Sequence, residues 1–244
     1  MAIAHVQSTG NRNDAAGLTL VKAFVSNVTA GNTIVVTAFC GIGQTISSVT
    51  DSLGNTYTER VSGISGRLKV YEAPNITGGA CTVTVTFSDS VPYRAMSIHE
   101  YSGMVNTGAF DVGAGATASR AGSSATDGNY TDNITTTANG DLIIGTIINI
   151  PAAWVAVAPG TGLTERYDDG PNGWYESEDK VQASSGSTNA TWTCDNTDAY
   201  YWIIASFKAA TALVSITPPA GSLSASGIAS RNDFGIFVPT EVDA

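Results

Sequence analysis

Short stretches in which apolar and polar residues alternate run along most of this chain. Val83, Val85 and Phe87 occupy every second position of one such stretch, and threonines lie between them. Because successive side chains of a strand point to opposite faces, this alternation predicts a strand with one buried and one wet face. Residues 34–36 and 142–144 are apolar without a break, which predicts central strands covered on both faces. Gly, Asn, Asp and Ser separate the runs, so the sequence predicts an all-β protein.

The runs recur in the same order in residues 31–103 and 139–210, at a nearly constant offset. The matched phrases include Glu59-Arg60 with Glu165-Arg166, and Tyr71-Glu72 with Tyr175-Glu176. We therefore expect two pseudo-repeated halves that pack face to face in one jelly-roll-like antiparallel β-sandwich over residues 1–210. Residues 113–132 are rich in Ala, Ser, Gly and Thr and are expected to form the exposed connection between the halves.

The charge of the chain excludes some classes of partner, and its cysteines indicate no disulfide framework. The formal net charge is -10, from 21 acids and 11 bases, and no basic cluster interrupts it. Nucleic acid and anionic membrane surfaces both attract Lys and Arg, so neither is an expected partner. No window approaches the roughly 18 apolar residues of a membrane span, and no charged leader precedes an apolar run, so no export signal is expected. Cys40, Cys81 and Cys194 are odd in number and widely spaced, and we interpret them as buried apolar residues.

The histidines, His5 and His99, give little support to nucleophilic catalysis. A Ser-His-Asp triad needs a histidine between a nucleophile and a carboxylate. His99 and Glu100 are neighbours on a predicted strand, so their side chains point to opposite faces. Two histidines also make a transition-metal site improbable, because such sites draw several ligands from His and Cys. We predict no catalytic residue and no metal or other cofactor.

A pair of acids, Glu176 and Glu178, comes closest to an enzyme motif. Both side chains would share one strand face at a Cα separation of about 6.6 Å, near the carboxyl spacing that glycosidases use. Such a pair could serve a glycoside hydrolase as acid and base. The alternative, which we favour, is that two acids on a wet sheet face keep the surface soluble.

Tryptophan and turn residues offer two binding alternatives. Trp154, and Trp174 with Tyr175, are candidate platforms for a sugar ring, because an exposed indole can stack on a pyranose. Trp192 and Trp202 occupy repeat positions that are apolar in the first half, so both are expected in the core. Calcium ligands could come from turns that contain Asp51 with Asn55, and Asp168 with Asp169. Asp and Asn also occupy turns for local hydrogen bonding alone, and this second interpretation is favoured.

The end of the chain carries the most specific motif. Gly227-Ile228-Ala229-Ser230, followed by Phe234-Gly235 and Val238, resembles a segment found near the C-termini of tailed-bacteriophage virion proteins. Residues 49–57, 71–75 and 98–103 are similar to phrases of a β-sandwich module found in phage and bacterial surface proteins. Neither similarity includes a catalytic residue.

The resemblance implies a non-enzymatic structural protein of the virion, either a capsid decoration protein or a head or tail appendage. Its partners would be other virion proteins, and by analogy it would form a homo-oligomer, most plausibly a trimer. Residues 211–244 would form an extended docking arm, with contacts through Ile228, Phe234, Gly235, Ile236, Phe237 and Val238. The alternative function is a carbohydrate-binding β-sandwich module, displayed on a virion, that recognises host glycans.

Overall fold

The computed structural model describes residues 2–149, 157–170, 173–195 and 197–210. Apart from one short 3-10 turn, η1 (Ile64–Gly66), its regular elements are strands, and the paired strands run antiparallel. The predicted all-β sandwich class is therefore confirmed. Within these ranges no helix has the length and hydropathy that crossing a bilayer requires. Some predicted site residues lie outside the described ranges, namely Trp154 and the arm residues Ile228, Phe234, Gly235, Ile236, Phe237 and Val238.

The first half of the described chain forms two sheets. The first inner sheet has the order β1 (Ala4–Asn13), β8 (Arg94–Ser102), β3 (Thr33–Phe39), β6 (Leu68–Ala73) and β5 (Thr58–Gly63). The first outer sheet has the order β2 (Gly17–Ala23), β7 (Thr82–Val91) and β4 (Ile46–Asp51). One apolar cluster, with Val36, Val83 and Val85 among its members, fills the space between these two sheets.

The second half repeats this arrangement. The second inner sheet has the order β9 (Phe110–Gly115), β18 (Tyr200–Phe207), β12 (Asp141–Asn149), β15 (Tyr175–Gln182) and β14 (Thr164–Asp168). The second outer sheet contains β10 (Asn129–Tyr130), β17 (Thr191–Cys194) and β13 (Val157–Pro159), beside the pair β11 (Ile134–Thr136) and β16 (Gly186–Thr188). Each strand of the second inner sheet has a counterpart at the same place in the first. The shared order agrees with a duplication, which stays a prediction, as does the jelly-roll assignment.

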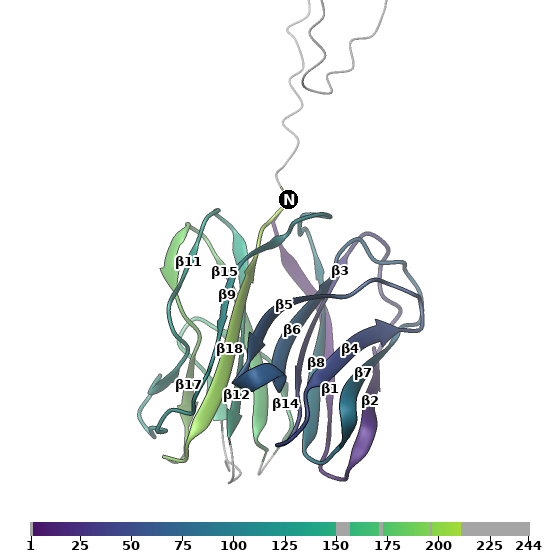
Figure 1. The fold of residues 1–244 in the computed structure, drawn as a ribbon. Helices are drawn as coiled ribbons and strands as arrows, with labels where there is room; N and C mark the ends of the chain where they lie inside the picture. Colours follow the sequence, from purple (N-terminus) through teal and green to yellow (C-terminus); the bar gives the residue numbers. More distant parts are fainter. Residues whose placement is uncertain (1, 150–156, 171–172, 196, 211–244) are drawn as a thin grey trace, which may run out of the picture. The chain divides into compact units, whose positions relative to one another are not determined.

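The sheets stack in four layers, in the order outer, inner, inner, outer (Figure 1). A cluster with Phe39 and Val70 from one half and Ile144 and Phe207 from the other lies between the two inner sheets. Every residue of β3 and of β12 is buried, as their unbroken apolar runs predicted. The expected arrangement of one two-layer sandwich is wrong, because each half is itself two layers thick and the halves meet through their inner sheets.

The expected exposed connection at residues 113–132 is also wrong in part. Its first residues belong to β9, and Ala116 is buried in the core of the second half. The small side chains reflect a close approach between β9 and β5. A Cβ atom on Gly113 would lie 2.3 Å from a methyl group of Val61, and the Ile64 amide donates to the Ala116 carbonyl at 2.7 Å. Packing between the halves, rather than a flexible linker, therefore explains the Gly and Ala content of this end.

Both inner sheets have the same irregular edge. The ladder of β5 with β6 shifts after Glu59, and that of β14 with β15 shifts after Glu165. The arginine that follows each glutamate forms an ion pair with a buried acid of the neighbouring strand. The pairs are Arg60 with Glu72 at 2.7 Å and Arg166 with Asp179 at 2.8 Å.

This shared edge fixes which residues of the two halves correspond. Glu59 pairs with Tyr71, whereas Glu165 pairs with Glu178. Tyr71 therefore corresponds to Glu178 and not to Tyr175, so the expected match of Tyr71-Glu72 with Tyr175-Glu176 is wrong in register. The same ladders make Glu176 the counterpart of Lys69.

Candidate functional site

A buried polar layer lies at the centre of the contact between the two inner sheets. Oγ1 of Thr146 on β12 is 3.0 Å from Oγ1 of Thr37 on β3. Thr37 also contacts Ser97 Oγ at 2.8 Å, and its carbonyl accepts a hydrogen bond of 2.9 Å from the Tyr175 hydroxyl. These four residues have no exposed surface. Because a buried hydroxyl is costly without a partner, this layer favours one alignment of the halves.

His99 belongs to the same layer. Its Nε2 lies 2.8 Å from Ser97 Oγ and 3.4 Å from Ser177 Oγ, while Nδ1 has no hydrogen-bond partner in the described part of the chain. Complete burial, reinforced by the charges of His5 and Arg166, lowers the pKa of His99 to about 3, so the ring is neutral. A Ser-His contact that the sequence did not suggest is thus present, because Ser97 and His99 are two residues apart on one strand face. Within the described ranges no acid contacts Nδ1, so the contact lacks the orienting carboxylate of a triad.

Trp174 and Tyr175 do not form the expected sugar platform. The Trp174 side chain is 7% exposed and Tyr175 is fully buried. The indole packs edge-on against Phe39 of the first half at 5.3 Å, and the Arg12 guanidinium covers it at 5.1 Å. A ring covered in this way cannot stack on a pyranose, so the interpretation of this pair as a glycan platform is corrected.

The acids Glu176 and Glu178 do share one face of β15, as predicted, but that face is buried. Both residues lie between the second inner and outer sheets, with exposed fractions of 1% and 0%. The Gly160 amide donates to one oxygen of Glu178 at 3.0 Å. The remaining three carboxyl oxygens of the pair, and the Trp192 indole nitrogen, have no hydrogen-bond partner among the described residues. The expectation that these acids lie on a wet surface is wrong.

Burial also decides the charge of this pair. Desolvation is the largest cause that raises the pKa of Glu176 well above its ordinary value, and Glu178 and Glu165 add to it. Burial raises the pKa of Glu178 to about 9, although the Gly160 amide opposes the shift. Both acids are therefore protonated at neutral pH. A glycosidase needs one ionised carboxylate and room for a sugar, and this arrangement supplies neither.

In the two turns considered for calcium, Asp51 and Asp169 have both carboxyl oxygens bonded to other protein groups. Asp51 accepts hydrogen bonds from the Leu53 amide, the Tyr57 hydroxyl and both the amide and side chain of Asn55. Asp169 accepts from the amides of Trp174 and Tyr175 and from Arg12. These contacts support the interpretation of both turns as local hydrogen-bonded structures. Within the described ranges, no three His, Cys, Asp or Glu side chains are grouped so that they could hold a metal ion.

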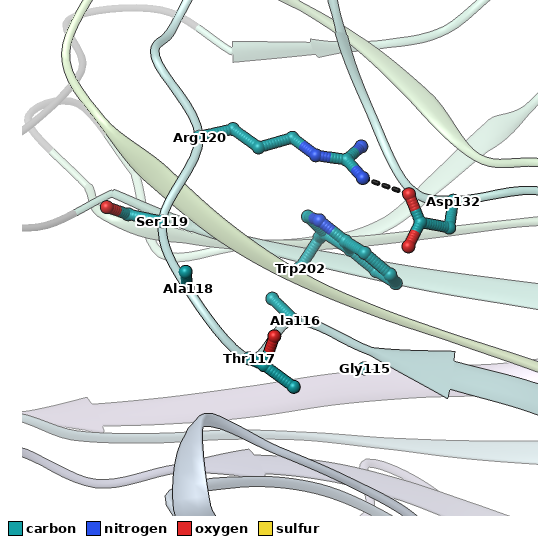
Figure 2. A pocket seen from close by; sticks show the side chains of 8 residues that line it. All are labelled: Gly115, Ala116, Thr117, Ala118, Ser119, Arg120, Asp132 and Trp202. Carbon is teal, nitrogen blue, oxygen red and sulfur yellow. Dashed lines mark hydrogen bonds and ion pairs between the residues drawn. The ribbon is translucent and has the colours of Figure 1, made fainter.

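A pocket of about 300 Å³ opens beside Trp202, where the chain leaves β9 (Figure 2). The guanidinium of Arg120 lies over the Trp202 ring at 4.9 Å and over the Tyr130 ring at 5.1 Å. It also forms an ion pair with Asp132 and donates to the Tyr130 carbonyl at 2.7 Å. Thr117 and Ser119 add hydroxyl groups to the lining. Charged and hydroxyl groups line this pocket. Trp202 is buried, as its repeat position predicted, and that position therefore did not indicate a pocket beside it.

Comparisons with known proteins add no assignment. No protein-family model matches the chain, and no curated protein or solved structure matches it. The function must therefore be argued from the residues and their geometry.

Proposed function

We propose that this protein is a non-enzymatic structural component of a tailed-bacteriophage virion. In this proposal the four-layer β region is the body, and residues 211–244 are the arm through which it attaches to other virion proteins. The body would form a homo-oligomer around a symmetry axis, most plausibly a trimer.

One observation carries the non-enzymatic part of this proposal. The groups most suited to acid-base chemistry, His99, Glu176 and Glu178, are buried and uncharged at neutral pH. Side chains in this state stabilise a packed shell and do not meet a substrate. The virion part is supported by the resemblance of residues 227–238 to virion proteins and by the acidic, β-rich body.

Removal of the arm tests the proposal. Particles assembled with the full chain should contain it, as measured by mass spectrometry of purified particles, whereas a chain that ends at residue 210 should be absent from them. Phe234→Ala and Phe237→Ala should weaken incorporation, and Leu213→Ala, in the same segment but outside the resembling motif, serves as the matched control. Circular dichroism establishes that each variant keeps its β structure. Full incorporation of a folded, truncated chain would contradict the docking role.

The pocket beside Trp202 supports a second candidate function, recognition of a glycan. Its volume lies at the small end of the range for ligand sites, which suits one sugar residue. Asp132, Arg120 and the hydroxyls of Thr117 and Ser119 could bond to sugar hydroxyls. Trp202, which is 3% exposed and covered by Arg120, forms the floor of the pocket and offers no stacking platform.

Glycan-array binding by the full chain tests this candidate. If the pocket binds a sugar, Asp132→Asn and Ser119→Ala should each reduce the signal. Asp89→Asn changes an exposed acid in the first half and should leave it intact. Binding that survives both pocket substitutions would place the glycan elsewhere.

A further inference from the structure

Three ionisable side chains meet at one end of the second inner sheet, on adjacent strands. The ladders align Leu142, Phe207 and Phe110, which pack on the core between the two inner sheets. Because neighbouring side chains alternate between faces, the residues next to these three point to the opposite face. They are Asp141 at the start of β12, Lys208 just after β18, and Asp111 on β9.

Contacts hold the acid and the amine of this group together. Nζ of Lys208 lies 3.2 Å from Oδ1 of Asp111, whose side chain is only 2% exposed. Thr137 fixes the same carboxyl group from the other side. Its amide donates to Oδ2 at 2.7 Å, and its hydroxyl donates to Oδ1 at 2.5 Å.

Asp141 is the unusual member of the group. It is fully buried, and neither of its carboxyl oxygens has a hydrogen-bond partner of normal geometry among the described residues. Burial is the main cause that raises the pKa of Asp141 to about 6, and the neighbouring Asp111 carboxyl adds to it. Two carboxyl groups this close favour a state in which Asp141 keeps a proton and shares it with Asp111.

We propose that Lys208 and Asp111 become joined by an intramolecular amide bond, with Asp141 as the acid-base residue and Thr137 as the oxyanion donor. The nucleophile lies just after β18 and the electrophile on β9, and both assisting groups come from the segment at the start of β12. This proposal does not rest on the virion function.

The step balances without any other reactant. A proton moves from the Lys208 ammonium to the Asp111 carboxylate, so that a neutral amine faces a carboxylic acid. Nζ then attacks Cγ of Asp111, and the Thr137 amide stabilises the oxygen that gains negative charge. Asp141, which starts protonated, gives its proton to the leaving oxygen and takes a proton from the attacking nitrogen. The Nζ–Cγ bond forms, one Cγ–O bond breaks, a water molecule leaves, and Asp141 returns to its starting state.

The ion pair of Lys69 with Glu59 is a built-in control for this chemistry. Its Nζ and Oε2 atoms are 2.8 Å apart, closer than those of Lys208 and Asp111. However, the Glu59 side chain is 42% exposed. Among the described residues its carboxyl group has hydrogen bonds with Lys69 and Tyr71 and none with a second acid. If proximity alone were sufficient, an amide bond would form between Lys69 and Glu59 as well. If the assisting groups are required, the bond forms only between Lys208 and Asp111.

Mass spectrometry of the full chain, unfolded after purification, tests the proposal. We expect a mass lower than that of the sequence by one water. Trypsin should fail to cleave after Lys208, giving a branched peptide in which residues 95–120 are joined to residues 181–231. Dehydration at the Asp-Gly bonds of Asp127 or Asp169 gives the same mass loss, so the branched peptide decides. An unmodified mass with normal cleavage after Lys208 would overturn the proposal.

Variants separate the roles of the residues. Lys208→Arg keeps the charge and the ion pair but removes the amine, so the full mass should return. Asp111→Asn keeps the shape of the side chain, and any bond it forms would release ammonia in place of water. Asp141→Asn keeps both reacting groups and should slow bond formation about 100-fold or more, the contribution typical of general acid-base catalysis. An unchanged rate of bond formation in a folded Asp141→Asn chain would show that Asp141 is not the acid-base residue. An amide bond between Lys69 and Glu59 would show that proximity alone is sufficient, without assisting groups.

Discussion

The two halves share a strand order and a bulged edge, yet equivalent positions of that edge carry side chains of different chemistry. In the first half, Lys69 and Tyr71 of β6 both contact Glu59 of β5, with Nζ and the hydroxyl at 2.8 Å and 3.5 Å from the same carboxyl oxygen. This is an ordinary arrangement for the rim of a sandwich, in which a cation and a hydroxyl satisfy one acid.

In the second half, Glu176 and Glu178 replace Lys69 and Tyr71 at the same ladder positions, and Glu165 faces them in place of Glu59. Three acids therefore meet where the first half has one. This difference shows that the pairing of the edge strand with its neighbour does not depend on attraction between these side chains. Burial protonates Glu176 and Glu178, and protonated acids can occupy a core that ionised ones could not.

The largest expected effect is a fall in the stability of the second half as pH rises. Glu176 and Glu178 have raised pKa values in the folded protein, that of Glu178 about 9, so the native state binds more protons than the unfolded state above pH 4.5. The free energy of unfolding should therefore decrease, by roughly 1.4 kcal/mol per pH unit for each such group. The decrease begins near pH 4.5 and ends as the pH passes the folded pKa.

Urea unfolding at pH 5, 7 and 9 measures this slope. Glu176→Gln with Glu178→Gln replaces the two acids with neutral amides of similar shape and should flatten it, so that the variant exceeds the natural chain in stability at pH 9. Glu59→Gln in the first half is the matched control and should leave the slope in place. Equal slopes for the natural chain and the double variant would show that these acids are not protonated in the fold.

The second contrast concerns the two arginine ion pairs of the bulged edges. Among the described residues, the Glu72 carboxylate accepts its hydrogen bond from Arg60, and its other oxygen has no partner. Asp179 instead accepts a second hydrogen bond, of 2.7 Å, from the Tyr101 hydroxyl. Arg60→Met should therefore cost about 3–5 kcal/mol, the cost of leaving a buried charge without its partner. Arg166→Met should cost about 1–3 kcal/mol, because Tyr101 still supports Asp179.

Denaturant unfolding at pH 8 compares the two variants, and methionine keeps the apolar stem of each arginine in place. At pH 5 the cost of Arg60→Met should shrink, because burial already raises the pKa of Glu72 and a proton can replace the lost cation. Equal costs for the two substitutions would mean that Tyr101 gives Asp179 no support.

Sequence patterns predicted which residues form strands better than they predicted which strand faces are covered by other parts of the protein. Alternation placed Glu176 and Glu178 on one face, but whether that face is wet depends on the sheet that covers it. That sheet consists of strands of two to four residues, too short for a periodic pattern to reveal. The same applies to Trp174, which follows a glycine-rich turn and therefore looked exposed. Its cover comes from Arg12 and Phe39, far away in the sequence.

The residue-by-residue match between the two halves was the other part that sequence patterns predicted poorly. A bulge inserts one residue into one strand of a ladder and shifts every later pair. The match of Tyr71-Glu72 with Tyr175-Glu176 ignored the bulges and assigned inward-facing Tyr175 to outward-facing Tyr71. The phrases with Glu59-Arg60 and Glu165-Arg166 matched correctly, because those arginines are the bulged residues in both halves.

The smallest expected effect tests how the two halves fill equivalent cores. The inner-sheet ladders place Gly145 of the second half where the first half has Val36. Val36 packs in a core with Val83 and Val85, whereas Gly145 lies against Ala190 and Trp192. The small Gly145 and Ala190 leave room for the indole, since a Cβ on Gly145 would lie 2.4 Å from that of Ala190 and 3.1 Å from the Trp192 ring. Gly145→Ala should therefore cost about 1–3 kcal/mol through overpacking.

A double-mutant cycle sharpens this last contrast. Ala190→Gly alone should also destabilise the fold, because it removes a buried methyl group. Combined with Gly145→Ala, it moves the methyl group from one strand to the other and should recover part of the loss, as a favourable coupling between residues in contact. Thermal unfolding of the two single variants and the double variant measures that coupling. Additive losses would show that the indole, and not the pair of small residues, sets the volume of this core, so that the two halves solve the packing problem with different key residues.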